Sequence, residues 1–120
     1  MAFCEISILH AKFTVNLDWF KNQDPFVRIT YNGQTYETSV RNGAGLEAEW
    51  KDEQFVIEDV GSDCLVQFTA YDSDLLRNEV IGQSSGVPLG SLKHGVSMVH
   101  LFNSENTKTG SMKVRVVKTE

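Results

Sequence analysis

The chain lacks several features that would place it in common functional classes. It has no run of basic residues, and its 120 residues hold 16 Asp and Glu against 11 Lys and Arg, for a formal charge of −5. An acidic chain without a basic stripe argues against nucleic acid as the main partner. No apolar stretch reaches transmembrane length, so any membrane contact is expected to be peripheral.

Cysteine is also scarce. Cys4 and Cys64 both fall in strand-like segments beside apolar residues, so we expect small core side chains and no disulfide framework. The sequence has no N-glycosylation triplet, and its start resembles neither a signal peptide nor a myristoylation signal. These absences favour a cytoplasmic protein. The length and the 41% hydrophobic content predict one domain over residues 1–120 with a substantial core.

What the sequence does have is an apolar alternation with a period of two. Met112, Val114 and Val116 alternate with Lys113 and Arg115, which indicates a strand with one buried face. No segment shows a sustained period of 3.6, and at most residues 88–94 form a helical turn. The same pattern predicts eight strands, at about residues 4–8, 26–31, 34–40, 55–57, 66–70, 80–87, 96–102 and 112–116.

Short strands at this spacing predict an all-β fold, an antiparallel sandwich or barrel. Asn32-Gly33 separates the second and third strands, and both residues accept the positive φ of a type I′ hairpin turn.

Five acidic residues gather in two turns between these strands. Carboxylates held close together repel one another, so a cluster of them usually has a cation as its partner. Oxygen ligands without neighbouring His or Cys favour calcium. When these five are set aside, the remaining acids and bases are equal at 11 each. The five are Asp18 and Asp24 in the first turn and Asp72, Asp74 and Glu79 in the second.

Neither acidic turn is sufficient by itself to indicate a metal site. An acid before proline, as in Asp24-Pro25, is also a common turn starter. An EF-hand counted from Asp72 fails, because Leu76 and Arg77 occupy positions that need an oxygen ligand and a glycine. A metal site must therefore be assembled from both turns, and a sandwich allows this because loops at one end of its sheets come together.

The order of these motifs resembles the C2 domain family. Calcium-binding C2 domains carry an Asp, five residues and Asp-Pro-Tyr in one loop, and Asp-x-Asp with a later acid before a hydrophobic pair and Gly in another. The corresponding segments here are residues 18–26 and 71–82, and residues 43–55 resemble a further family segment. The resemblance covers about residues 3–118. Since one strand precedes the first acidic loop, it implies an eight-stranded antiparallel β-sandwich of type II topology.

The resemblance also implies a ligand set. Side-chain ligands would be the five acids, although Glu79 replaces the usual Asp and has a longer reach. Main-chain ligands would be the carbonyls of Leu17 and Ser73. The implied cofactor is Ca²⁺.

Four apolar residues lie inside the acidic turns: Trp19 and Phe20, and Leu75 and Leu76. They could pack inward as loop anchors, or they could form membrane-inserting tips. Each inserted tip would contribute roughly 1.5–3 kcal/mol. Relatives that bind phosphoinositides use a Lys-rich strand, and residues 34–40 contain neither Lys nor Arg. We therefore expect insertion driven by the loops and no strong phosphoinositide site.

Catalysis is not expected. Gly82-Gln-Ser84-Ser-Gly86 matches a hydrolase nucleophile elbow, but that motif needs a strand–turn–helix corner in a larger α/β fold. The three histidines show no metal or triad spacing. Acids without an adjacent His or Lys make good chelators and poor acid–base catalysts, which also disfavours a hydrolase with paired acids.

The sequence thus predicts a calcium-dependent phospholipid-binding module with a targeting or calcium-sensor role in signalling. It would act as a cytoplasmic monomer that associates reversibly with membranes. The alternative is a calcium-independent protein-interaction sandwich with an idle or structural metal site.

Overall fold

The structure, a computed structural model, describes residues 2–18 and 20–119. In this part of the chain the regular structure consists of strands and one short 3-10 turn, η1 (Leu89–Ser91). No helix here is long and apolar enough to cross a bilayer. The strands are β1 (Phe3–Phe13), β2 (Pro25–Tyr31), β3 (Gln34–Glu37), β4 (Glu47–Glu49), β5 (Gln54–Glu58), β6 (Leu65–Asp72), β7 (Glu79–Gln83), β8 (Val87–Pro88), β9 (Gly95–Phe102) and β10 (Lys108–Thr119).

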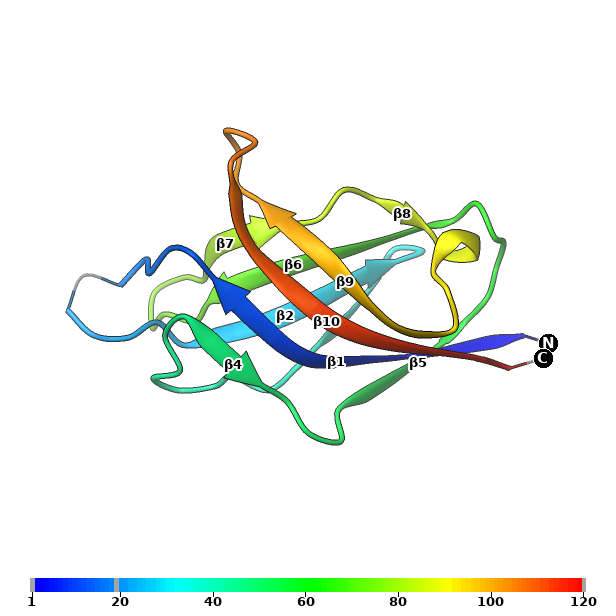
Figure 1. The fold of residues 1–120 in the computed structure, drawn as a ribbon, viewed down its shortest axis with the longest axis horizontal. Coiled ribbons are helices and arrows are strands. Elements are labelled where there is room, and N and C mark those ends of the chain that lie inside the picture. The colour runs from blue at the N-terminus through cyan, green and yellow to red at the C-terminus, as the bar shows by residue number, and fades with distance from the viewer. Residues whose placement is uncertain (1, 19, 120) are drawn as a thin grey trace.

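The strands pair antiparallel in the order β3-β2-β6-β7-β9-β10-β1-β4, with β5 beside β1 and β8 beside β6. One bridge, between Gln83 and Phe102, joins β7 to β9. On either side of this bridge, β3-β2-β6-β7 and β9-β10-β1-β4 form two layers that face each other (Figure 1). The predicted antiparallel β-sandwich is confirmed.

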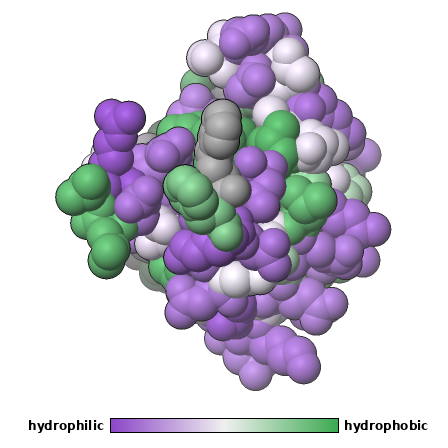
Figure 2. All heavy atoms as spheres, turned by 90° about the vertical axis from the view of Figure 1, so that its left-hand side faces the viewer, coloured by the Kyte–Doolittle hydropathy of each residue, from purple (hydrophilic) through white to green (hydrophobic). Residues whose placement is uncertain are grey.

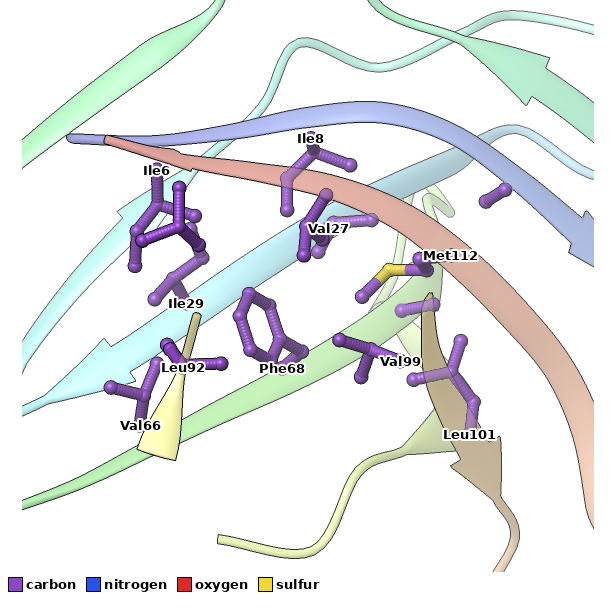
Figure 3. Close-up of a cluster of buried hydrophobic side chains, with 14 of the residues drawn as sticks. Ile6, Ile8, Val27, Ile29, Val66, Phe68, Leu92, Val99, Leu101 and Met112 are labelled. Atoms are coloured by element: carbon purple, nitrogen blue, oxygen red, sulfur yellow. The ribbon is translucent and has the colours of Figure 1, made fainter. Parts of the chain in front are cut away.

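The core fills the space between the two layers (Figure 3). Ile6 and Ile8 of β1 face Val27 and Ile29 of β2, and Phe68 of β6 lies among them, fully buried. Successive side chains in a strand point to opposite faces, so the alternation in the sequence becomes one apolar face for each layer. Burial of each such side chain stabilises the fold by roughly 1.5–3 kcal/mol.

Several local predictions are confirmed. Asn32 and Gly33 have φ of 50° and 75°, and Tyr31 pairs with Gln34 on either side of them, which closes the β2–β3 hairpin. Cys4 of β1 is a buried core residue, as predicted, whereas Cys64 lies just before β6 and is only partly buried, which differs from the prediction. The helical turn expected over residues 88–94 is η1.

Strand boundaries differ from the prediction in three places. β3 ends at Glu37, because the Thr38 hydroxyl accepts the Val27 N–H at 2.9 Å and replaces a ladder contact. The sixth predicted strand divides into β7 and β8, because the buried Ser84 hydroxyl accepts the Phe68 N–H at 3.0 Å. The short strand β4 was not predicted. The eight expected strands are therefore present, and β4 and β8 bring the strand segments in the described chain to ten.

Both acidic turns lie at the same end of the sandwich. The β1–β2 loop (residues 14–24), the β3–β4 loop (38–46) and the β6–β7 loop (73–78) meet there (Figure 1). Both chain ends extend from the opposite end. We call the first of these the loop end.

Candidate functional site

Two hydrogen bonds hold the two acidic turns against each other. The Asp24 N–H donates to Asp72 Oδ1 at 2.8 Å, and the Ser73 N–H donates to the Asp24 carbonyl at 2.9 Å. These contacts continue the β2–β6 ladder, in which Pro25 pairs with Asp72. A metal site built from both turns requires that they lie at the same end of the sheets. The structure meets this requirement.

Asp72 is a buried acid at the base of the loop end. Its side chain stands at the end of β6, and the residue is only 5% exposed. Burial raises the pKa of its carboxyl, and the negative charges of Asp24, Asp18 and Glu79 act in the same direction, while the bond from the Asp24 N–H opposes them. In this environment a charged Asp72 is unfavourable unless a cation comes close.

Asp24 is almost as buried but better satisfied. Burial raises its pKa, but the Gly43 N–H and the Lys21 ammonium outweigh burial and lower the pKa below its usual value. Gly43 donates to Oδ1 at 2.6 Å, and Lys21 Nζ lies 3.1 Å from Oδ2. Two neighbouring aspartates therefore differ in the direction of their pKa shift, because the Gly43 N–H and the Lys21 ammonium bind Asp24, whereas the acids around Asp72 add to the effect of its burial.

Asp18 and Asp74 shape their own turns. Asp18 Oδ1 accepts the N–H groups of Phe20 and Lys21 at 3.0 and 3.2 Å. Asp74 Oδ1 accepts the Leu76 N–H at 3.3 Å. These are Asx-type turns, in which a short acidic side chain bonds to the backbone two or three residues ahead.

Gln23 supports the first loop from inside. Its amide is fully buried and donates to the carbonyls of Val15 and Gly45 at 2.8 and 2.9 Å. Its Oε1 accepts the Leu17 N–H at 3.1 Å. Gln23 was not predicted from the sequence, since a single Gln between two acids has no distinguishing pattern. The acids were expected to have no Lys beside them, although Lys21 lies three residues from both Asp18 and Asp24.

Two adjoining hollows open between the loops. One has a volume of about 470 Å³ and is lined by Asp18, Lys21, Asp24, Asn42, Ser73, Asp74 and Leu75. The other has a volume of about 380 Å³ and is lined by Leu17, Asp18, Phe20, Lys21, Asp72, Asp74 and Glu79. Together they include all seven residues of the predicted ligand set.

The acids surround these hollows without closing around one point. Within residues 2–18 and 20–119, no three His, Cys, Asp or Glu side chains are grouped closely enough to hold a metal ion. The donors nevertheless fit calcium in kind, because they are carboxylate and carbonyl oxygens, and the buried Asp72 has a raised pKa and forms no ion pair in the described structure. Calcium binding would require the loops to draw their carboxylates together.

Apolar side chains project around the acids. Phe20, Leu75 and Leu76 are 99%, 103% and 95% exposed, so none of the three packs inward as a loop anchor. Trp19, the fourth predicted tip, lies outside the described residues. Figure 2, which faces the loop end, shows green apolar side chains set among purple polar ones. Burying such exposed groups in an apolar phase would be favourable.

Fold and site together define an antiparallel β-sandwich with acidic loops at one end. The family model for the C2 domain matches residues 3–104, and the chain belongs to the C2 domain family. C2 domains are in general binding modules rather than enzymes, and family members commonly bind calcium and phospholipid membranes.

Solved structures agree on the fold. The C2A domain of plant Extended Synaptotagmin 1 superposes with a TM-score of 0.85 at 20% identity, covering 99% of this chain and 97% of that one. The calcium-bound C2A–C2B pair of Extended-Synaptotagmin 2 gives 0.79 at 16% identity, covering 96% and 44%. Human GIVD cytosolic phospholipase A2 gives 0.79 at 14% identity, covering 99% and 16%. No curated protein sequence matches the chain.

Proposed function

We propose that this C2 domain binds calcium at the loop end and thereby attaches reversibly to phospholipid membranes, as a targeting or calcium-sensor module without catalysis. The observation that carries the proposal is the convergence of five acids from two separate turns on two adjoining hollows, with exposed Phe20, Leu75 and Leu76 beside them. The calcium-bound state of a structural relative, Extended-Synaptotagmin 2, also supports it.

The chain would hold calcium through the carboxylates of Asp18, Asp24, Asp72, Asp74 and Glu79 and the carbonyls of Leu17 and Ser73. Bound calcium would neutralise the acids and offer open coordination positions to a lipid phosphate oxygen. Asp72 and Asp24 lie at the bottom of the site, where β6 and β2 fix their backbones. Asp18 and Asp74 sit on the loops and Glu79 begins β7, so the side chains of these three acids would move toward an ion.

Insertion of the loop tips would add to this electrostatic step. Each apolar side chain transferred into the bilayer contributes roughly 1.5–3 kcal/mol before ordering costs. Two or three tips therefore suffice for reversible attachment. β3 has no Lys or Arg, so we propose no strong phosphoinositide site there.

Calcium affinity should fall between about 10⁻⁶ and 10⁻⁴ M, the range of sensors and weaker modules. Membrane binding and calcium binding should strengthen each other by the same factor, because coupling between two ligands is reciprocal.

The test is a calorimetric calcium titration of the wild type and of Asp72→Asn, with and without vesicles of mixed zwitterionic and anionic phospholipid. We expect the wild type to bind calcium more tightly with vesicles present, and Asp72→Asn to lose at least about tenfold in affinity. No heat and no thermal shift at millimolar calcium would reject the proposal.

A second candidate is a protein partner, bound without calcium. Beside β9 lies a mostly apolar groove of about 420 Å³, whose lining residues include Val87, Leu92, Met98 and Phe102 but no acid. This candidate predicts that a partner is captured in the presence of a chelator and is lost when Met98 is replaced by a charged residue.

A further inference from the structure

Lys21 occupies an unusual position in the candidate site. It lies in the β1–β2 loop between Asp18 and Asp24, and it lines both hollows at the loop end. Among the described residues that line the two hollows, Lys21 is the one basic side chain. The other ion pairs of the described chain, such as Arg28–Glu37 and Arg41–Glu53, involve none of the seven proposed ligand residues.

Hydrogen bonds within the loop hold the backbone of Lys21 in place. The Lys21 N–H donates to Asp18 Oδ1 at 3.2 Å, and the Lys21 carbonyl accepts from Asn16 Nδ2 at 3.4 Å. From this position the ammonium reaches Asp24 Oδ2 at 3.1 Å. The hydrogen bond to Asp24 raises the pKa of Lys21, and the charges of Asp24, Asp18 and Asp72 add to the effect. The side chain is therefore a cation surrounded by acids of the site.

The two oxygens of Asp24 are both engaged. Oδ1 accepts the Gly43 N–H at 2.6 Å, a backbone contact from the β3–β4 loop. Oδ2, which accepts no backbone N–H, is the more open oxygen for a metal ion, and it is the oxygen that Lys21 holds. An ion that coordinates Asp24 through Oδ2 must displace the ammonium, because two cations cannot share that contact without strong repulsion.

Displacement does not require the fold to change. The Lys21 side chain is 65% exposed, and Asp24 is its one hydrogen-bond partner in the described structure. A freed ammonium can turn into solvent and remain hydrated, so it leaves no buried charge behind. The cost of displacement is then the ion pair alone.

We propose that Lys21 is a built-in competitor for the calcium position, which keeps Asp24 neutralised in the resting protein and raises the calcium concentration at which the site fills. This inference rests on the proposed calcium site and names a residue that tunes it. It also explains how the domain tolerates five clustered acids before calcium arrives.

Calorimetric calcium titration of Lys21→Gln, without lipid, tests the inference. Removing an exposed ion pair of this kind should strengthen calcium binding by roughly 1.5- to 5-fold. Removing the repulsion between the lysine and calcium should strengthen it further. We therefore expect Lys21→Gln to bind calcium about 3- to 10-fold more tightly than the wild type at low salt. The difference should shrink in 0.5 M salt, since screening weakens charge competition.

Two matched variants separate local competition from net charge. Lys113→Gln removes the same charge from β10, where Lys113 pairs with His10 and Met98 and lines neither hollow. It should leave calcium affinity within about twofold of the wild type, because a distant surface charge is screened. Lys21→Arg keeps the charge and should stay near the wild type.

A second readout does not depend on affinity. The side-chain NMR signals of Lys21 should shift on calcium addition as the ammonium leaves Asp24, while those of Lys113 stay in place. Equal affinities for Lys21→Gln and Lys113→Gln, weaker binding by Lys21→Gln, or an unmoved Lys21 signal at saturating calcium would each overturn the inference and leave the calcium site standing. Absence of calcium binding in all variants would overturn both.

Discussion

At the scale of single residues, the aspartates of the loop end repel one another, and neighbouring groups stabilise the charge of Asp24 but not that of Asp72. Asp24 has a lowered pKa because Gly43 and Lys21 outweigh its burial, whereas Asp72 has a raised pKa because burial and three other acids dominate. Asp72 therefore destabilises the calcium-free fold when it is charged. Such local cost is typical of binding sites, whose groups are arranged for a ligand rather than for stability.

Asp72→Asn should accordingly stabilise the calcium-free domain at neutral pH while it weakens calcium binding. Asn can still accept the Asp24 N–H, so the backbone contact of 2.8 Å is kept. A raised folded pKa means that the stabilising contribution of Asp72 is complete below its unfolded pKa and is lost as pH rises through the folded pKa.

The difference between variant and wild type should thus be largest at pH 7 and vanish in acid, where wild-type Asp72 is protonated. Thermal melts in chelator at pH 7 and in acid measure this difference in stability. A gain of 1 kcal/mol in the free energy of unfolding corresponds to a rise of roughly 4 °C in the melting temperature. A lower melting temperature for Asp72→Asn at pH 7 would contradict the argument.

A buried polar group without a hydrogen-bond partner in the described structure lies on β10. Thr109 Oγ1 is buried and has no hydrogen-bond partner among the described residues. Thr109→Val removes this unsatisfied group with little change in shape, and we expect it to raise the free energy of unfolding by about 1 kcal/mol. Urea denaturation measures the change. Thr38→Val is the matched control and should lose about 1 kcal/mol, because its hydroxyl accepts the Val27 N–H.

At the scale of elements, β7 approaches the second layer so closely that it requires glycine. A Cβ on Gly82 would lie 2.2 Å from Thr109 Oγ1 and 2.9 Å from Leu101 Cβ. This contact lies next to the Gln83–Phe102 bridge that joins the two layers. Gly82 therefore lets the layers close on this side, which gives the first glycine of the Gly82–Gly86 segment a packing role.

Gly82→Ala should destabilise the domain by about 1–3 kcal/mol, the usual cost of overpacking. Gly86→Ala is the control, because its nearest neighbour is Leu65 Cδ1 at 3.0 Å, the end of a half-exposed side chain that can move. Denaturant midpoints compare the two variants. If Gly86→Ala cost as much as Gly82→Ala, close packing of β7 would not be the reason for the glycine.

At the scale of the whole molecule, charge and apolar tips are separated from the rest of the domain. The five acids share the loop end with Phe20, Leu75 and Leu76, whose side chains are almost fully exposed, and the remaining acids and bases are balanced. The proposed calcium binding would change the charge of this end and leave the charge of the sheets as it is.

Replacing Phe20, Leu75 and Leu76 together by alanine should abolish calcium-dependent sedimentation with vesicles. Calcium affinity without lipid should stay within about twofold, because these side chains point into solvent and their backbone contacts remain. The control is Val96→Ala with Met98→Ala, two exposed apolar residues on β9. Equal loss in the control would show that general hydrophobicity, not the loop tips, drives attachment.

The strands other than β4, the β2–β3 hairpin and the grouping of the acids into two turns could be predicted from the sequence alone. These features follow from local chemistry: a two-residue alternation gives a one-sided strand, and Asn32-Gly33 accepts positive φ. Three contacts of the site depend on the packing of the layers and could not be predicted: the Gly43 N–H donates to Asp24, the Lys21 ammonium faces Asp24 Oδ2, and the Gln23 amide holds the first loop. These contacts join loops whose distance depends on how the two layers pack, and no local pattern encodes that packing.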